Sequence, residues 1–273
     1  AAGSRDNTPV VLTGSADGTV TYGNDSVTVD ASHTEEGYLM VSYSGSNSKV
    51  KLQITGSDEI TYTYNLHDGY ETFPLTSGSG SYTVGVFENI EGTSYSTLFT
   101  QAIDVTIQDE FGPYLYANQY VNFSADSKVI SKAMELSASA NDDLEVIENV
   151  YNYIITNFTY DYDKAASVQS GYLPDVDKVF TENTGICFDY AALMASMLRS
   201  QNIPTKLEVG YSGDAYHAWI STYIDDKDKG WVNGIIEFDG NDWKLMDPTF
   251  ASTSSDPKDF LTQTDEYITK YVY

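Results

Sequence analysis

The first third of the chain alternates apolar and polar residues in short runs that turn residues separate. β-Branched and aromatic residues fill these runs, a pattern typical of strands that bury one face. The sequence therefore predicts an all-β, immunoglobulin-like sandwich domain over residues 1–110, in which residues 1–9 form a loose leader. The runs lie at residues 19–22, 26–29, 38–43, 49–54, 60–64, 81–87 and 99–107.

A different pattern begins after residue 110, where apolar residues recur at three- and four-residue steps. It predicts helices over residues 127–140 and 142–158, and a third helix with a buried stripe that includes Tyr190, Leu193 and Met197. Helices followed by an antiparallel sheet predict an α+β domain over residues 111–273. Its strand-like runs lie at residues 206–211, 217–224, 235–238 and 243–247.

The chain has a single cysteine, Cys187, in the predicted first turn of that third helix, with Asn183 or Thr184 as the candidate cap and Gly185 at a tight turn. Unpaired amides and the positive end of a helix dipole favour a thiolate over a thiol there. Cys187 is therefore a candidate nucleophile. The alternative is an inert small hydrophobe, which is the commoner role of a lone cysteine on an amphipathic helix.

A cysteine nucleophile needs a base, and the chain has three histidines. His33 and His67 lie in the predicted sandwich, whereas His217 opens a strand of the second domain. Asp247 ends a later strand, before a proline that cannot continue the ladder. Cys187, His217 and Asp247 thus predict a nucleophile, a base and an orienting carboxylate. The alternative for Asp247 is to accept backbone hydrogen bonds in a turn.

These residues and their order resemble the transglutaminase-like cysteine enzyme superfamily. The resemblance implies a papain-like core over residues 127–273, with the Cys187 helix packed on an antiparallel sheet that carries His217 and Asp247. The motifs that carry it lie at residues 185–191 (GICFDYA), 203–204 (IP), 209–211 (VGY), 217–219 (HAW), 243 (W) and 247–249 (DPT).

The resemblance also implies a further site residue and a setting. In this superfamily a side chain upstream of the cysteine often joins the oxyanion hole, and Tyr160 is the candidate here; the alternative for Tyr160 is packing after an apolar helix. Asp189 is expected to be structural and to accept helix-start donors. Residues 113–120 and the tail toward Tyr273 are similar to secreted Firmicute members with an N-terminal immunoglobulin-like domain.

Composition narrows the class of partner. A net charge of −26 argues against binding a nucleic-acid backbone, which requires clustered cations. One cysteine excludes an intramolecular disulfide framework and a multi-thiolate metal site. Residues 225–230 resemble a calcium loop only superficially, because lysines stand where oxygen ligands belong, and we expect a solvated turn. The sequence predicts neither a metal nor another cofactor.

The function predicted from these features is cysteine-dependent acyl transfer on protein or peptide amides through a thioester intermediate. Water or an amine can accept the acyl group, which leaves protease, amidase and transglutaminase reactions open. The sequence shows no signal peptide and no apolar run near the roughly 20 residues of a membrane span. The Ser-, Thr- and Tyr-rich first third resembles Gram-positive surface proteins, so we expect a secreted or cell-surface protein whose sandwich meets a cell-wall partner. The alternative is a catalytically silent adhesion protein.

Overall fold

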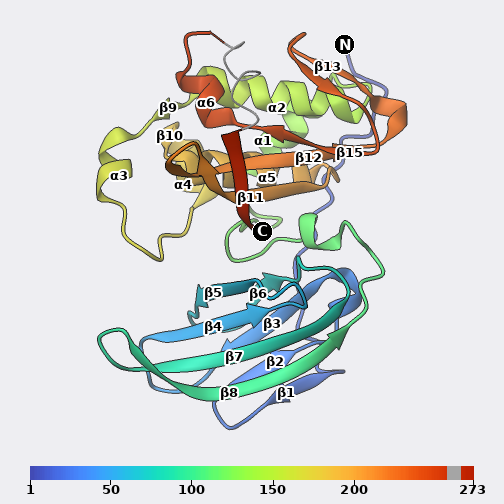
Figure 1. Ribbon diagram of the computed structural model, residues 1–273. Coiled ribbons are helices and arrows are strands. Elements are labelled where there is room, and N and C mark those ends of the chain that lie inside the picture. The colour runs from blue at the N-terminus through green and yellow to red at the C-terminus, as the bar shows by residue number, and fades with distance from the viewer. Residues whose placement is uncertain (257–265) are drawn as a thin grey trace. The chain divides into compact units, whose positions relative to one another are not determined.

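The computed structural model describes residues 1–256 and 266–273, which form two compact units (Figure 1). One unit comprises Thr13–Gln119, and the other comprises Ala1–Leu12 together with Tyr120–Tyr273. The sequence predicted one domain over residues 1–110 and another over 111–273. The structure divides the chain differently, because the first twelve residues pack with the C-terminal unit.

The unit Thr13–Gln119 consists of two four-stranded antiparallel sheets. Fully buried side chains such as Leu39, Leu52 and Val84 fill its core, and the Tyr64 and Phe73 rings, from different sheets, lie 4.7 Å apart. One sheet has the order β1 (Thr21–Gly23), β2 (Val27–Asp30), β3 (Tyr38–Tyr43), β6 (Glu71–Pro74); the other has the order β5 (Thr61–Asn65), β4 (Val50–Thr55), β7 (Gly80–Glu91), β8 (Ser94–Val105). Two short 3-10 helices, η1 (Thr34–Glu36) and η2 (Gly112–Tyr114), complete it.

The all-β character of this unit is confirmed, and its seven predicted runs correspond to strands. Strand β6 was missed because it has four residues and ends in a proline, which leaves too little alternation to detect. The finer, immunoglobulin-like assignment stays a prediction.

The second unit places helices around a four-stranded antiparallel sheet with the order β15, β12, β11, β16 (Figure 1). The predicted arrangement of a helix on an antiparallel sheet is thus confirmed. The sheet strands are β11 (Thr205–Ser212), β12 (Ala215–Ile224), β15 (Asp242–Met246) and β16 (Tyr267–Val272). The helices are α1 (Lys128–Ser137), α2 (Asp143–Asn157), α3 (Tyr162–Ser167), α4 (Val176–Glu182), α5 (Cys187–Ser200), α6 (Pro248–Thr253) and η3 (Asp226–Asp228). Two short pairs are β9 (Thr159–Tyr160) with β10 (Thr184–Gly185) and β13 (Gly230–Val232) with β14 (Ile236–Phe238).

Helix α5 is the centre of this unit. The sequence predicted one buried stripe, but every residue from Asp189 to Ser200 is buried. The reason is that α5 contacts four helices, α1, α2, α4 and α6, as well as strands β11 and β12. Small residues such as Ala191 and Ala195 allow this close packing on several sides.

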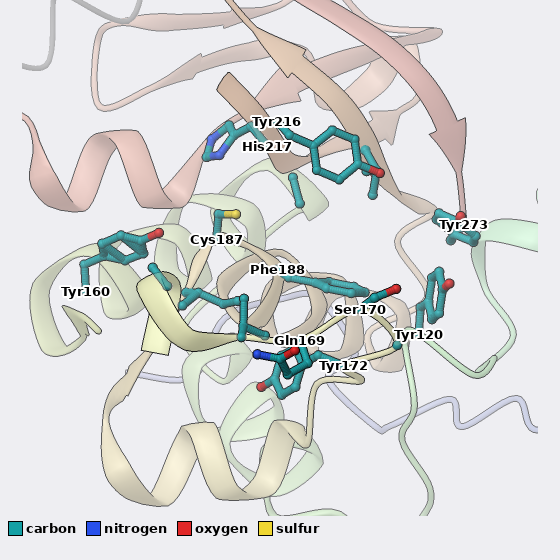
Figure 2. A pocket seen from close by; sticks show the side chains of 16 residues that line it. Tyr120, Tyr160, Gln169, Ser170, Tyr172, Cys187, Phe188, Tyr216, His217 and Tyr273 are labelled. Carbon is teal, nitrogen blue, oxygen red and sulfur yellow. The ribbon is translucent and has the colours of Figure 1, made fainter. Parts of the chain in front are cut away.

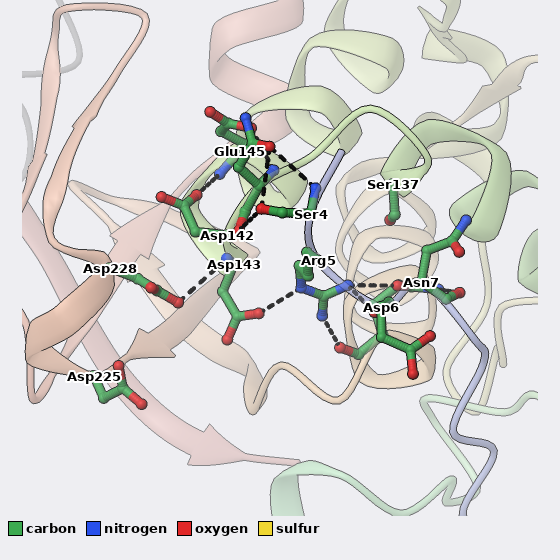
Figure 3. A network of polar contacts seen from close by, with 12 residues as sticks. Ser4, Arg5, Asp6, Asn7, Ser137, Asp142, Asp143, Glu145, Asp225 and Asp228 are labelled. Atoms are coloured by element: carbon green, nitrogen blue, oxygen red, sulfur yellow. Dashed lines mark hydrogen bonds and ion pairs between the residues drawn. The ribbon is translucent and has the colours of Figure 1, made fainter. Parts of the chain in front are cut away.

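The N-terminal segment is an ordered part of the same unit (Figure 3). The Arg5 guanidinium donates to Asp143 Oδ1 at 2.7 Å and to Gln201 Oε1 at 2.8 Å, which ties the segment to the start of α2 and the end of α5. Two backbone hydrogen bonds, each 2.8 Å long, hold the segment at both of its ends. The Gly3 amide donates to the Ala138 carbonyl, and the Val10 amide donates to the Ser200 carbonyl. The prediction of a loose leader at residues 1–9 is therefore wrong.

Among the helices in residues 1–256 and 266–273, none is both long enough and apolar enough to cross a membrane.

Candidate active site

Cys187 is the first residue of α5, and its side chain is half-buried. Neither predicted cap is used: Asn183 ends α4 in a left-handed conformation (φ 55°), and Thr184 lies in β10. The Ile186 amide instead donates to Asp189 Oδ2 at 2.9 Å, so a carboxylate within the first turn satisfies the helix start. The expectation that Asp189 accepts helix-start donors is confirmed.

The Asp189 carboxylate is fully buried and has two further donors. Lys164 Nζ lies 2.7 Å from Oδ2, and the Tyr172 hydroxyl donates to Oδ1. A Cβ at Gly185 would lie 2.7 Å from Asp189 Cβ, so glycine is needed for close approach and not for a turn. These contacts bind the segment that contains α3 to the start of the Cys187 helix.

His217 and Asp247 meet at the edge of the sheet. The two residues belong to neighbouring elements, because β12 pairs with β15 in the register Ile220↔Met246. His217 Nε2 lies 2.7 Å from Asp247 Oδ2, and the Asp247 side chain is 1% exposed. The Asp247 carboxylate also caps α6 by accepting from the Phe250 amide at 3.0 Å through Oδ1. The two carboxylate oxygens of Asp247 therefore have different partners, the ring of His217 for Oδ2 and a backbone amide for Oδ1.

The environment of His217 favours the imidazolium. Burial of the ring alone would lower the pKa of His217, but hydrogen bonds to Asp247 and to Cys187 and the negative charges of both groups outweigh burial and raise this pKa to about 10. At neutral pH the ring is thus protonated beside the sulfur. The candidate nucleophile therefore has a cationic ring as its neighbour.

Cys187 and His217 line one cavity of about 410 Å³, at the same end of it (Figure 2). Tyr160 lines it too: its strand β9 pairs with β10 so that Tyr160 stands opposite Gly185, two residues before the cysteine. Burial, and then the charge of Cys187, raise the pKa of the Tyr160 hydroxyl, so it stays a hydrogen-bond donor. The structure thus brings all the sequence-predicted site residues together at one site.

Three polar residues of the site escaped sequence analysis. Tyr267, in β16, donates to Asp247 Oδ2 at 2.6 Å, and its ring packs edge-on against Trp219 at 4.9 Å. Lys164 and Tyr172 reach Asp189 from the segment between α2 and α5. The sequence offered one indication of these residues, namely that their segments flank the motifs of Cys187 and Asp247. That position does not predict which carboxylate they contact.

Metal ligation has no candidate group in the described residues. No cluster of three or more His, Cys, Asp or Glu side chains with suitable geometry occurs in residues 1–256 and 266–273. The segment expected to be a solvated turn forms η3, where Asp228 is 9% exposed and accepts from the Asp143 amide (Figure 3). Burial and neighbouring carboxylates raise the pKa of Asp228. The expectation of a solvated turn is confirmed for Asp225, Asp226, Lys227 and Lys229, which are exposed, and is wrong for Asp228.

The fold and this grouping of side chains define a class of protein. A cysteine at a helix start, beside a histidine–carboxylate pair on a sheet, is typical of cysteine-dependent enzymes. Residues 130–234 match the family model described as Transglutaminase-like superfamily. The matched range includes Cys187 and His217 and ends before Asp247.

Individual proteins resemble the chain more distantly. UPF0252 protein MJ1282 of Methanocaldococcus jannaschii is 31% identical over 108 residues, which are 35% of this chain and 30% of the relative. The matched segment therefore spans less than a third of that relative. A structure described as a candidate cysteine protease from Cytophaga hutchinsonii has a TM-score of 0.39 and 17% identity, covering 85% of this chain and 69% of the other. Red sea bream transglutaminase has a TM-score of 0.37 and 13% identity, with 80% and 48% covered.

Proposed function

We propose that the protein catalyses acyl transfer on protein or peptide amides through a thioester on Cys187. The observation that carries the proposal is the His217–Asp247 pair, 2.7 Å apart, at the cavity that holds the only sulfhydryl of the chain. The superfamily match over residues 130–234 supports a cysteine-dependent enzyme in general. The choice of reaction rests on the chemistry of these side chains.

In the first half-reaction the Cys187 thiolate attacks the amide carbonyl carbon and forms a C–S bond. The Cys187 amide belongs to the first helical turn, whose N–H groups lack intrahelical partners, and it stabilises the oxyanion together with the Tyr160 hydroxyl. The His217 imidazolium then gives its proton to the departing nitrogen as the C–N bond breaks. An acyl thioester and a neutral imidazole remain.

In the second half-reaction the neutral imidazole of His217 removes a proton from the acceptor, which attacks the thioester carbonyl and releases the sulfur. Water as the acceptor makes the enzyme a protease or amidase, whereas an amine makes it a transglutaminase. Asp247 holds the ring orientation through both steps, since its carboxylate fixes Nε2 and leaves the other ring nitrogen for the proton transfer. We propose that this reaction takes place outside the cell, with the β unit as a surface for a cell-wall partner.

The test combines one substitution with three parallel assays. Peptide cleavage, ammonia release from glutamine peptides and incorporation of a fluorescent amine are measured for the wild type and for Cys187→Ala. We expect turnover in at least one assay for the wild type and none for Cys187→Ala, with an unchanged circular-dichroism spectrum. Turnover that survives in Cys187→Ala contradicts the proposal. A wild type that is silent in all three assays favours the adhesion alternative, in which cell-wall binding persists in Cys187→Ala.

A further inference from the structure

Apart from Cys187 and His217 themselves, the side chains that line the cavity are uncharged, although the chain carries 40 Asp and Glu residues. None of its described lining residues is Asp, Glu, Lys or Arg. Aromatic rings dominate the lining instead. Apart from Tyr160, they are Tyr120, Tyr172, Phe188, Tyr216 and Tyr273.

Four of these rings form a continuous series along one side of the cavity, with two edge-to-face contacts and one tilted contact. Tyr172 lies 6.3 Å from Phe188, Phe188 lies 5.4 Å from Tyr120, and Tyr120 lies 4.3 Å from Tyr273, measured between ring centroids. Both ends of the series are fixed. The Tyr172 hydroxyl is bound to the buried Asp189, and the Tyr273 backbone exchanges two hydrogen bonds with Leu207. Rings held in this way need no further ordering when a ligand binds.

The fifth ring, that of Tyr216, lies on the opposite side of the cavity from Phe188 (Figure 2). Tyr216 precedes His217 in β12, and Phe188 follows Cys187 in α5, so the two rings flank the two reacting groups. Tyr216 is 64% exposed, and its ring packs edge-on against that of Tyr211 at 5.6 Å, which leaves much of its surface open to solvent. A flat or bulky apolar side chain between these rings would bury both faces and remain next to the sulfur.

We infer that the cavity binds a large uncharged side chain, aromatic or branched aliphatic, on the acyl side of the amide and within two residues of the reacting carbonyl. This inference rests on the proposed function, and it names the substrate class of the same site. The acyl part of the substrate stays on the enzyme through both half-reactions, so contacts between the cavity and this part can favour each of the two half-reactions. An acidic side chain is disfavoured twice, because the lining offers it no Lys or Arg and because the chain carries a net charge of −26.

The experiment uses acetyl-dipeptidyl chloromethyl ketones as probes. The thiolate displaces chloride, a C–S bond replaces the C–Cl bond, and the mass increase is mapped to Cys187. Phe, Leu, Ala or Asp is placed at either peptide position with Ala at the other, and iodoacetamide serves as a reagent without a side chain. We expect the Phe and Leu probes to react about tenfold faster than the Ala probe at one or both positions, and the Asp probe to be slowest.

Two substitutions connect this preference to the rings. Phe188→Ala and Tyr216→Ala should each reduce the ratio of Phe-probe to Ala-probe rates to about threefold or less. Because Tyr216 is largely exposed, its substitution leaves the fold intact even if Phe188→Ala does not. Trp231→Ala is the matched control: Trp231 is 54% exposed and lies outside the cavity lining, so the ratio should not change.

The outcomes separate this inference from the proposed function. Equal rates for the Phe, Ala and Asp probes, with iodoacetamide reacting normally at Cys187, overturn the substrate class and leave the nucleophile intact. A Cys187 that reacts with neither iodoacetamide nor any probe overturns the proposed function itself. A side-chain preference that survives both ring substitutions also overturns the inference, because the rings then do not cause it.

Discussion

Two buried carboxylates near the candidate nucleophile, Asp189 and Asp247, are built alike and differ in one partner. Asp189 accepts a helix-start amide from Ile186, a hydroxyl from Tyr172 and the ammonium of Lys164. Each of these donors comes from a different element. The carboxylate is thereby compensated and holds the first turn of α5 in place.

The carboxylate of Asp247 also has three donors, and two of them are of the same kind as at Asp189. It accepts a helix-start amide from Phe250, a hydroxyl from Tyr267 and a ring N–H from His217. The donor that differs is the third one, an imidazole in place of an ammonium. An imidazole can lose its proton within a catalytic cycle, whereas the lysine stays charged. Under the proposed mechanism the Asp247 carboxylate supports the chemistry, whereas the Asp189 carboxylate only holds the helix start in position.

The largest effect should come from Asp247→Asn. The amide retains the size of the side chain but removes the charge that stabilises the His217 imidazolium, and it no longer fixes one orientation of the ring. We expect turnover to fall on the order of 10³-fold. Steady-state kinetics in whichever assay detects wild-type activity measures this loss. A loss of less than tenfold would mean that Asp247 merely caps α6.

The next effect is on the pH dependence of the same variant. The folded-state pKa of His217 is raised to about 10, so the wild type should lose activity on the basic side only as the pH approaches that value. In Asp247→Asn the pKa of His217 should fall toward its ordinary value near 6.5, and the basic limb should move down with it. Profiles from pH 5 to 11 measure the shift. Coincident basic limbs would contradict the assignment.

Lys164→Met should mainly cost stability. It leaves the fully buried Asp189 without its cation, and because the Lys164 side chain is 29% exposed we expect a loss of about 2 kcal/mol, below that of a fully buried pair. Urea unfolding measures the loss, and Lys164→Arg is the matched control that retains the charge. The basic limb of the pH profile should not move, since Lys164 acts on the other carboxylate. A shift of the basic limb in Lys164→Met would contradict the separate roles of Asp189 and Asp247.

The smallest effects should come from a matched pair, Tyr267→Phe and Tyr172→Phe. Each removes one hydroxyl from a buried carboxylate and should cost about 1–2 kcal/mol of unfolding free energy. Tyr267 shares Oδ2 of Asp247 with His217, so its loss should also concentrate charge on that oxygen and move the basic limb upward. Tyr172→Phe should leave the limb in place. Identical pH profiles for both variants would show that the Tyr267 hydroxyl does not influence the imidazole.

The sequence predicted the helices and strands of the second unit where periodicity is strong. It also indicated Cys187 as the candidate nucleophile and His217 as the candidate base, because the chain has one cysteine and its other two histidines lie in the β unit. Asp247 followed from its place between a strand and a proline. These predictions depend on the small number of cysteines and histidines and on the local pattern of strand residues and proline, both of which can be read directly from the sequence.

The remaining partners depend on pairings that are distant along the chain. Tyr267 reaches Asp247 only because β16 pairs with β11, and Lys164 reaches Asp189 across 25 positions. The N-terminal segment is the extreme case, since Arg5 donates a hydrogen bond to Gln201, far from it along the chain. Contacts of this kind are set by how the layers assemble, so neither propensity nor spacing reveals them.

The most direct test of the central claim is the rate at which iodoacetamide alkylates Cys187 at pH 6, compared with N-acetylcysteine under the same conditions. A thiolate stabilised by the helix start and by the protonated His217 should react faster than the free thiol, and His217→Ala should remove most of that advantage. A wild-type rate at or below that of N-acetylcysteine would contradict the account.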